Sequence, residues 1–224
     1  MTQIGEIVKD LSPAVRPERD TLEGRFTLVQ PLYPLVHGDA LYEGTHGPES
    51  AELWRYLPDG PFPDRPAFDV FLKHASVSHD PLFFAIVEKS SGLAAGMAAY
   101  LRIDPIHKVI EVGHILFTPK LQRTVAATEA MFLMAQHVFD LGFRRYEWKC
   151  NSLNEPSLRA ARRLGFTFEG IFRQHMIVKG RNRDTAWFSM LDSEWPDRKA
   201  AFEKWLDESN FDQNGRQKLS LSGT

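Results

Sequence analysis

The stretch TPKLQRTVAATEAMFLMAQHVFDLGF, Thr118–Phe143, decides the fold because it joins a strand to a long helix through a polar loop. The apolar run EVGHILF, residues 111–117, precedes it and is typical of a strand. From Ala127 to Leu141 two apolar stripes repeat at helical spacing, which predicts a helix lying on a sheet. Gly142 is placed to end that helix.

This order of strand, loop and helix start is one that proteins use to hold phosphate. Unpaired N–H groups and the positive end of the helix dipole favour an anion at residues 122–128. The loop contains no glycine, the residue that usually lets a backbone approach a phosphate. Most loops of this layout bind nothing, so the segment alone leaves phosphate binding open.

Composition limits the class of protein. The 224 residues carry a formal net charge of −2, with 43% apolar and 25% charged residues, which is the balance of a soluble globular protein. No global positive field attracts nucleic acid or an anionic membrane, and no run approaches the ~20 apolar residues of a membrane span. The chain has a single cysteine, which cannot form an internal disulfide, and this fits a reducing compartment. Its first residues do not form a secretory signal. We therefore expect a cytoplasmic protein that binds neither nucleic acid nor membrane directly.

The remaining pattern predicts one α+β domain with a mixed, mostly antiparallel sheet. We expect a loosely tied N-terminal arm over residues 1–24, a single domain over 25–209 that includes the C-terminal helix, and a polar tail over 210–224. Residues 166–191 are expected to form a hairpin whose turn is KGRNRD, residues 179–184. Other strands are expected at 25–32, 82–88, 93–103, 108–117 and 145–151, and other helices between 37 and 57 and at 67–76, 154–165 and 192–206.

Two motifs, with a strand between them, match one known family. QRTVAATEA, Gln122–Ala130, follows the pattern Gln-x-x-Gly-x-Ala-Thr-Glu-Ala except that Val125 replaces the glycine. NEPSLRAARRLGF, Asn154–Phe166, follows Asn-x-x-(Ala or Ser)-x-x-x-Tyr-x-x-x-Gly-Phe except that Ala161 replaces the tyrosine. Over about residues 26–191 the chain resembles the GNAT acetyltransferase superfamily, in particular the branch of the RimJ and RimL ribosomal-protein N-acetyltransferases.

The resemblance implies the GNAT fold, an α/β/α arrangement with helices on both faces of a twisted sheet that splays between its fourth and fifth core strands. Acetyl-CoA, the cosubstrate, is then expected in the V-shaped gap between GHILF, residues 113–117, and YEWKC, residues 146–150. Its pyrophosphate is expected on backbone amides at the start of the following helix. The residues that the resemblance implies in binding acetyl-CoA as a whole are Ile115, Leu116, Phe117, Gln122, Arg123, Thr124, Val125, Ala126, Ala127, Thr128, Asn154 and Ser157.

The missing glycine does not remove this site, because backbone amides do not depend on side-chain identity. Val125 disfavours a positive φ at its position, so we expect ordinary helical or extended geometry in the loop. Arg123 either adds charge beside the pyrophosphate or is a solvated loop arginine. The hydroxyls of Thr124 and Thr128 are candidate additional donors.

The resemblance also implies an acetyl-CoA-dependent N-acetyltransferase in which a primary amine attacks acetyl-CoA directly within a ternary complex. The acceptor is a protein N-terminus, as in the ribosomal branch, or a small-molecule amine, and the enzyme is a monomer or a homodimer. Met176 stands where the ribosomal branch has a glutamate. The departures at Val125, Ala161 and Met176 keep a rival hypothesis open, a non-catalytic acyl-CoA-binding or interaction module on the same fold.

Acetyl transfer to an amine requires a group that takes a proton, because an α-amine titrates near ~8 and a lysine near ~10.4. Glu111 is the first candidate for this base and His114 the second. Strand alternation predicts that Glu111, Gly113, Ile115 and Phe117 share one face of the strand and that His114 lies on the other.

Two further roles follow from the resemblance. A backbone amide near Phe117 is the expected donor to the oxyanion that develops on the acetyl group. The departing thiolate also needs a proton or a hydrogen bond, which Ala161 cannot supply. Ser157, at the matching position of the ribosomal branch, is the expected group, although serine is also common in the first turn of a helix.

The other residues that carry chemistry have simpler interpretations. The eight histidines show neither His-x-His nor His-Glu-x-x-His spacing, so we expect no metal site. Cys150 in mid-strand is typical of a small buried hydrophobe. KGRNRD is either a solvated hairpin tip or a site for a substrate carboxylate.

Overall fold

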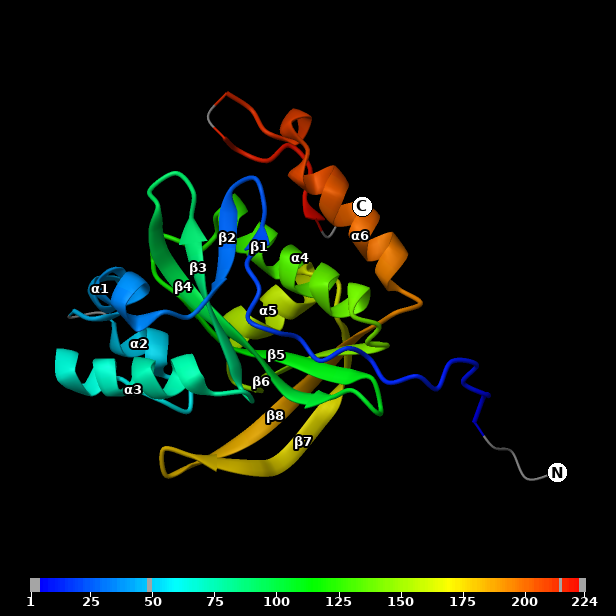
Figure 1. The fold of residues 1–224 in the computed structure, drawn as a ribbon, viewed down its shortest axis with the longest axis horizontal. Helices are drawn as coiled ribbons and strands as arrows, with labels where there is room; N and C mark the ends of the chain where they lie inside the picture. The colour runs from blue at the N-terminus through cyan, green and yellow to red at the C-terminus, as the bar shows by residue number, and fades with distance from the viewer. Residues whose placement is uncertain (1–4, 48–49, 214, 222–224) are drawn as a thin grey trace.

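An eight-stranded sheet runs through the molecule and carries helices on both faces (Figure 1). The structure is a computed structural model that describes residues 5–47, 50–213 and 215–221. The strand order is β1-β2-β3-β4-β5-β6-β8-β7, and within the described strands β5 and β6 form the single parallel pair. The strands are β1 (Leu22–Glu23), β2 (Thr27–Pro31), β3 (Leu82–Glu88), β4 (Leu93–Asp104), β5 (Val109–Phe117), β6 (Arg145–Asn151), β7 (Thr167–Val178) and β8 (Arg181–Leu191).

The helices form two layers, one on each face of the sheet (Figure 1). Alternate residues of one strand enter different cores, because successive side chains of a strand point to opposite faces. Phe83 is buried with the first layer and Phe84 with the second. This is the predicted α/β/α arrangement. The first layer is α1 (Pro34–Thr45), α2 (Ala51–Trp54) and α3 (Arg65–Val77), and the second is α4 (Val125–Asp140), α5 (Glu155–Arg163) and α6 (Trp195–Leu206), which is followed by the short helix η1 (Glu208–Asn210).

The sheet splays between β5 and β6, which are the fourth and fifth core strands when β2 is counted as the first. Paired residues run only from Val109 with Arg145 to Val112 with Trp148. Beyond that point, residues 113–117 pair with β4 and residues 149–151 pair with β8. The gap therefore opens where the resemblance predicted it, and it removes the hydrogen-bonding neighbour from the last residues of β5.

A β-bulge interrupts β5 at the start of this gap. His114 and Ile115 together stand opposite the single residue Ala98, because the register shifts between the flanking pairs. His114 adopts a φ of 47°, which places it in the left-handed region. An extra residue of this kind reverses the alternation of side chains that follow it.

The bulge makes the predicted faces of β5 wrong. Ile115 and Phe117 pack against the core under α4–α6, whereas Leu116 is buried in the core under α1–α3. His114 stacks edge-on against Phe83, which also belongs to the α1–α3 side. Glu111 and His114 thus share a face, and Ile115 and Phe117 lie on the other.

The terminal segments are held more firmly than expected. The N–H groups of Ala14 and Val15 donate to carbonyls of the β4–β5 turn and of the α4 C-terminus, and β1 pairs with β2. In the tail, Asn210 and Leu221 are buried, and Leu221 joins the core under α4–α6. The expectation of a loosely tied arm is wrong for residues 14–23. Residues 1–4, 214 and 222–224 of the predicted arm and tail lie outside the described residues.

The β7–β8 hairpin turns more tightly than KGRNRD suggested. Val178 pairs with Arg181, so the turn consists of Lys179 and Gly180 alone. Their φ angles are 49° and 72°, as a two-residue hairpin turn with two left-handed residues requires. Residues 181–184 therefore belong to β8, and their side chains are presented by a strand.

Candidate active site

The start of α4 presents two free backbone donors. Thr124 is its N-cap: the hydroxyl accepts from the Ala127 N–H at 3.1 Å and donates to the Leu121 carbonyl at 2.7 Å. Within the described residues, the N–H groups of Val125 and Ala126 have no hydrogen-bond partner. Because these amides stand at the positive end of the helix dipole, they are suited to an anion.

The loop before α4 contains a left-handed residue, contrary to expectation. Arg123 has a φ of 62°, whereas Val125 is the first residue of the helix. The left-handed position of this loop is thus Arg123, two residues before Val125 in the sequence. Gln122 ties the loop to β5, since its side-chain amide donates to the Phe117 carbonyl at 3.0 Å.

The hydroxyls of Thr124 and Thr128, the candidate additional donors, are engaged within the protein. Both hydrogen-bonding roles of the Thr124 hydroxyl are taken by the cap. The Thr128 hydroxyl is directed at the Thr124 carbonyl and accepts from Arg163 at 3.1 Å. Thr128 is also buried.

The Phe117 amide faces the gap between β5 and β6. The Thr118 N–H donates to the Ala95 carbonyl on β4 at 3.0 Å. Successive residues of an antiparallel strand direct their backbone groups to opposite sides, so the Phe117 N–H and C=O turn away from β4. The carbonyl is occupied by Gln122, whereas the N–H has no hydrogen-bond partner within the described residues.

Ser157 lies beside the gap on the first turn of α5. Asn154 caps this helix, as predicted, by accepting from the Ser157 N–H at 3.3 Å. The Ser157 hydroxyl accepts from the Trp148 indole N–H at 3.0 Å, and it also lies within hydrogen-bonding reach of the Cys150 thiol, to which its own hydrogen can be donated. Cys150 is buried nearby, and burial raises the pKa of its thiol against the opposing effect of Ser157, which disfavours the reactive thiolate.

Glu111 is enclosed by two cations. Its carboxylate contacts Arg102 at 2.6 Å and the Lys149 ammonium at 3.0 Å. Burial raises the pKa of the Glu111 carboxyl, although Lys149 and Arg102 act in the opposite direction. Lys149 also pairs with Glu147, so the carboxylate belongs to a network that joins β4, β5 and β6. A carboxylate held in this way is poorly placed to accept a proton from a substrate.

His114, by contrast, keeps its ring nitrogens free of hydrogen bonds within the described residues. Its side chain is 18% exposed, and Nδ1 lies 3.7 Å from an Asp59 carboxylate oxygen, too far for a hydrogen bond. Burial lowers the pKa of the imidazole, with Asp59 opposing and Arg102 and Arg183 reinforcing that effect. This lowering favours the neutral imidazole, the form that can accept a proton.

A groove of about 500 Å³ lies at the open end of β6. One wall comes from the segment after α2, another from the loop after β6, and the third from the β7–β8 hairpin. Sequence reasoning did not predict this cavity, although it did suggest KGRNRD as a site for a substrate carboxylate. The lining residues are Arg55, Tyr56, Asn151, Leu153, Val178, Lys179, Arg181, Asn182 and Arg183.

Comparison with known proteins identifies the family. A family model for the acetyltransferase (GNAT) domain matches residues 32–167, more than half of the chain. The chain belongs to the GNAT acetyltransferase family. Membership makes this protein an acetyl-CoA-dependent acyltransferase, and it confirms the predicted family.

Solved structures resemble this GNAT acetyltransferase over nearly its whole length. A GCN5-related N-acetyltransferase from Brucella melitensis is 51% identical, covers 96% of this chain and 97% of its own, and has a TM-score of 0.93. A probable acetyltransferase from Chromobacterium violaceum is 40% identical, with coverages of 88% and 98% and a TM-score of 0.81.

A more distant neighbour comes from the ribosomal branch. The acetyl transferase of Salmonella typhimurium that modifies the N-terminal serine of a 50S ribosomal subunit protein is 19% identical, with coverages of 77% and 99% and a TM-score of 0.67. This likeness is consistent with the predicted branch. At this identity it shows a shared fold alone, so the acceptor of that enzyme does not carry over.

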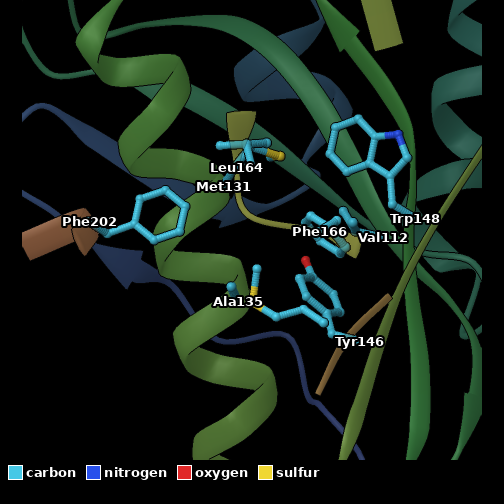
Figure 2. A pocket seen from close by; sticks show the side chains of 9 residues that line it. Val112, Met131, Ala135, Tyr146, Trp148, Leu164, Phe166 and Phe202 are labelled. Atoms are coloured by element: carbon cyan, nitrogen blue, oxygen red, sulfur yellow. The ribbon is translucent and has the colours of Figure 1, made fainter. Parts of the chain in front are cut away.

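A second space in this acetyltransferase is part of its core. Figure 2 shows apolar side chains of α4, β5 and β6 converging around it, with the Tyr146 hydroxyl among them. No room for a water molecule remains there. Within the described residues, no three His, Cys, Asp or Glu side chains gather in a metal-binding arrangement. No helix among the described residues is long and apolar enough to cross a membrane.

Proposed function

We propose that this GNAT acetyltransferase transfers the acetyl group of acetyl-CoA to a primary amine by direct attack of the amine within a ternary complex. The observation that carries the proposal is the grouping of unpaired donors at one opening of the sheet. The Val125 and Ala126 amides stand at the start of α4, and the Phe117 amide faces the gap beside them. These residues fit a ligand with phosphate at one end and a carbonyl oxygen in the gap.

Bound acetyl-CoA supplies a thioester whose carbonyl carbon the amine attacks. The Val125 and Ala126 amides hold the pyrophosphate, and the exposed Arg123 side chain adds positive charge beside it. The Phe117 N–H donates to the thioester oxygen and favours the negative charge that develops there. None of these roles depends on the glycine that Val125 replaces.

His114 takes the proton of the attacking amine at a ring nitrogen. It is neutral, partly exposed and placed at the bulge where the gap begins. Glu111 positions this strand through its cation pairs and is the second candidate for the base. The Ser157 hydroxyl, oriented by Trp148, donates to the departing sulfur.

The acceptor is a protein N-terminus or a small-molecule amine. The groove at the open end of β6 has the volume of a small-ligand site and accommodates either a short peptide end or a free amine. The cytoplasmic location, the absence of direct nucleic-acid binding and the oligomeric state stay predictions.

Thermal unfolding with and without acetyl-CoA tests the cofactor site. Ligand at about 100-fold its dissociation constant adds about 2.7 kcal/mol to the free energy of unfolding. For a domain of this size that means a rise in Tm of roughly 5–10 °C. ATP and NAD serve as controls and should give no comparable rise.

Two outcomes would contradict the proposal in different ways. No rise with acetyl-CoA, in protein shown to be free of copurified coenzyme A, would remove the cofactor site. A rise without acetyl transfer to any member of a broad amine panel would favour the non-catalytic acyl-CoA-binding module. Acetylation of one or more amines, followed by mass spectrometry, would support the transferase.

A further inference from the structure

The groove at the open end of β6 is rich in positive charge that the protein itself does not neutralise. Lys179, Arg181 and Arg183 line it, and within the described residues none of the three forms an ion pair with a carboxylate. Arg55, also in the lining, pairs with Glu52. Arg183 is partly buried, whereas Lys179 and Arg181 are exposed. A partly buried guanidinium without a direct counter-ion is costly, so Arg183 favours a site that receives an anion.

The acidic groups of this region make their direct contacts with other partners, although Asp59 still acts electrostatically on Lys179, and Glu111 on Arg183. Asp184 accepts from the Gln174 N–H at 2.7 Å and from the Asn182 side chain at 2.9 Å. The Asp59 carboxylate lies 3.7 Å from His114, on the side of the proposed base. Among the described residues the positive charge of the lining is therefore offset only at longer range and by no direct ion pair.

The walls of the groove are held in place by polar bonds between distant parts of the chain. The Lys179 ammonium donates to the Trp54 and Asp59 carbonyls at 2.7 and 2.9 Å, which ties the hairpin tip to the segment after α2. The Tyr56 hydroxyl donates to the Leu153 carbonyl at 3.0 Å. A preformed groove loses less freedom when a ligand binds, which favours specific recognition.

Arg183 connects the groove to the reaction centre. Its guanidinium donates to the Thr185 hydroxyl at 3.1 Å, which holds the side chain on the strand. Asn151 ends β6 three residues beyond the last β5–β6 pair, so the groove begins where the gap is open. An amine directed at the gap would thus carry its remaining atoms past Arg183 and Arg181.

We propose that this groove selects an acceptor that carries at least one carboxylate in addition to the amine. The inference rests on the proposed function, because it assigns the substrate class of the same site. Arg181 and Arg183 are two residues apart on β8, hence on one face and about 7 Å apart at their Cα atoms. Planar guanidinium groups match carboxylates in paired hydrogen bonds, and this spacing suits two separate carboxylates.

Binding of matched peptides tests the proposal without relying on turnover. Two pentapeptides with a free N-terminal alanine and a C-terminal fluorophore differ only at positions two and three, which are glutamate in one and glutamine in the other. Anisotropy at saturating coenzyme A gives both dissociation constants. We expect the glutamate peptide to bind at least about ten-fold more tightly, as loss of one or two charged hydrogen bonds implies.

Charge removal in the groove should abolish this preference. In the Arg181→Gln, Arg183→Gln double variant the ratio of dissociation constants should fall toward one. The control Arg144→Gln removes an exposed arginine just before β6, at the opposite end of that strand, and should keep the ratio. Equal binding of both peptides by the unaltered protein, or a ratio that survives in the double variant, would overturn the proposal.

Competition by free glutamate distinguishes the source of the carboxylate. If free glutamate displaces the labelled glutamate peptide at a concentration similar to that of the unlabelled peptide, the groove is assigned to small carboxylated amines. If free glutamate does not displace the peptide, the groove is assigned to peptide ends. Both results support carboxylate recognition. Charge-dependent binding without acetyl transfer would leave this inference standing and remove the proposed reaction, so the two failures are distinguishable.

Discussion

At the residue scale, one backbone angle changes the assignment of the base. Regular alternation would have placed Glu111 beside Ile115 and Phe117 and set His114 apart. The left-handed residue at the bulge instead brings His114 to the face of Glu111. There the carboxylate is taken by two cations, while the imidazole keeps its nitrogens free. The second candidate from the sequence becomes the first candidate from the structure.

His114→Gln should change the pH profile of the reaction. The neutral imidazole is the active form, and burial lowers its pKa, so the loss of activity due to protonation of His114 sets in only as pH falls through a midpoint below the usual ~6.5. For the unaltered enzyme, both the imidazole and the attacking amine must be neutral. A plot of log kcat/KM against pH should therefore rise with slope two below the His114 midpoint, and with slope one from there up to the pKa of the amine. The variant should show slope one throughout and roughly 100-fold lower activity. A profile altered by Glu111→Gln and not by His114→Gln would assign the base to Glu111.

Ser157→Ala should lower kcat with little effect on the KM for acetyl-CoA. The hydroxyl donates to the departing sulfur, so its loss should cost roughly 100-fold in kcat. It also releases the Trp148 indole, which should reduce the free energy of unfolding by about 1 kcal/mol. Ser157→Thr keeps a hydroxyl and should restore much of the rate. Equal kcat values in the alanine variant and the unaltered enzyme would remove the catalytic role.

At the element scale, the start of α4 presents free backbone donors although Val125 stands where the family pattern has a glycine. The helix begins at Val125, and its cap is supplied by Thr124. The left-handed turn that directs the chain into the helix is made at Arg123. Because the donors are backbone amides of the first turn, the change in side chain leaves them available.

Glycine substitutions at the two loop positions should therefore have opposite effects on stability. Arg123→Gly relieves a left-handed residue and should raise the free energy of unfolding by up to about 1 kcal/mol. Val125→Gly weakens the first helical turn and should lower it by roughly 1 kcal/mol. Chemical denaturation gives both values. A gain of stability or of acetyl-CoA affinity in Val125→Gly would show that the family glycine still suits its original position.

At the scale of the whole molecule, few backbone bonds join the two halves of the sheet. The parallel β5–β6 ladder ends at Val112 and Trp148. On the α1–α3 side, a buried ionic network spans the junction, with Lys149 between Glu111 and Glu147. On the other side, α4 covers both halves with apolar packing. The gap can stay open because side chains on both faces hold its edges.

Lys149→Met should be strongly destabilising. The Lys149 side chain is 2% exposed and its ammonium lies 3.0 Å from Glu111, so its removal leaves buried carboxylates without their shared cation. We expect a loss of about 3–5 kcal/mol in the free energy of unfolding. Lys199→Met on the exposed side of α6 is the matched control and should change stability by less than about 0.5 kcal/mol. A loss in Lys149→Met no larger than in the control would show that the network does not hold the junction.

The sequence by itself determined the order of the main elements, the limits of α5 and the family. Apolar periodicity predicted α4, Asn154 and Gly165 marked the limits of α5, and two motifs in order predicted the splayed sheet. These features depend on neighbours within one or two turns, which a linear pattern records.

The tertiary structure alone decided which side chains meet at the gap. The bulges in β5 and β7 shift register against a partner strand, and a shift of one residue moves every later side chain to the other face. The pairing of Lys149 with Glu111 and the groove between α2, β6 and the hairpin join residues far apart in sequence. Such contacts depend on how the strands stack, and no local period encodes that.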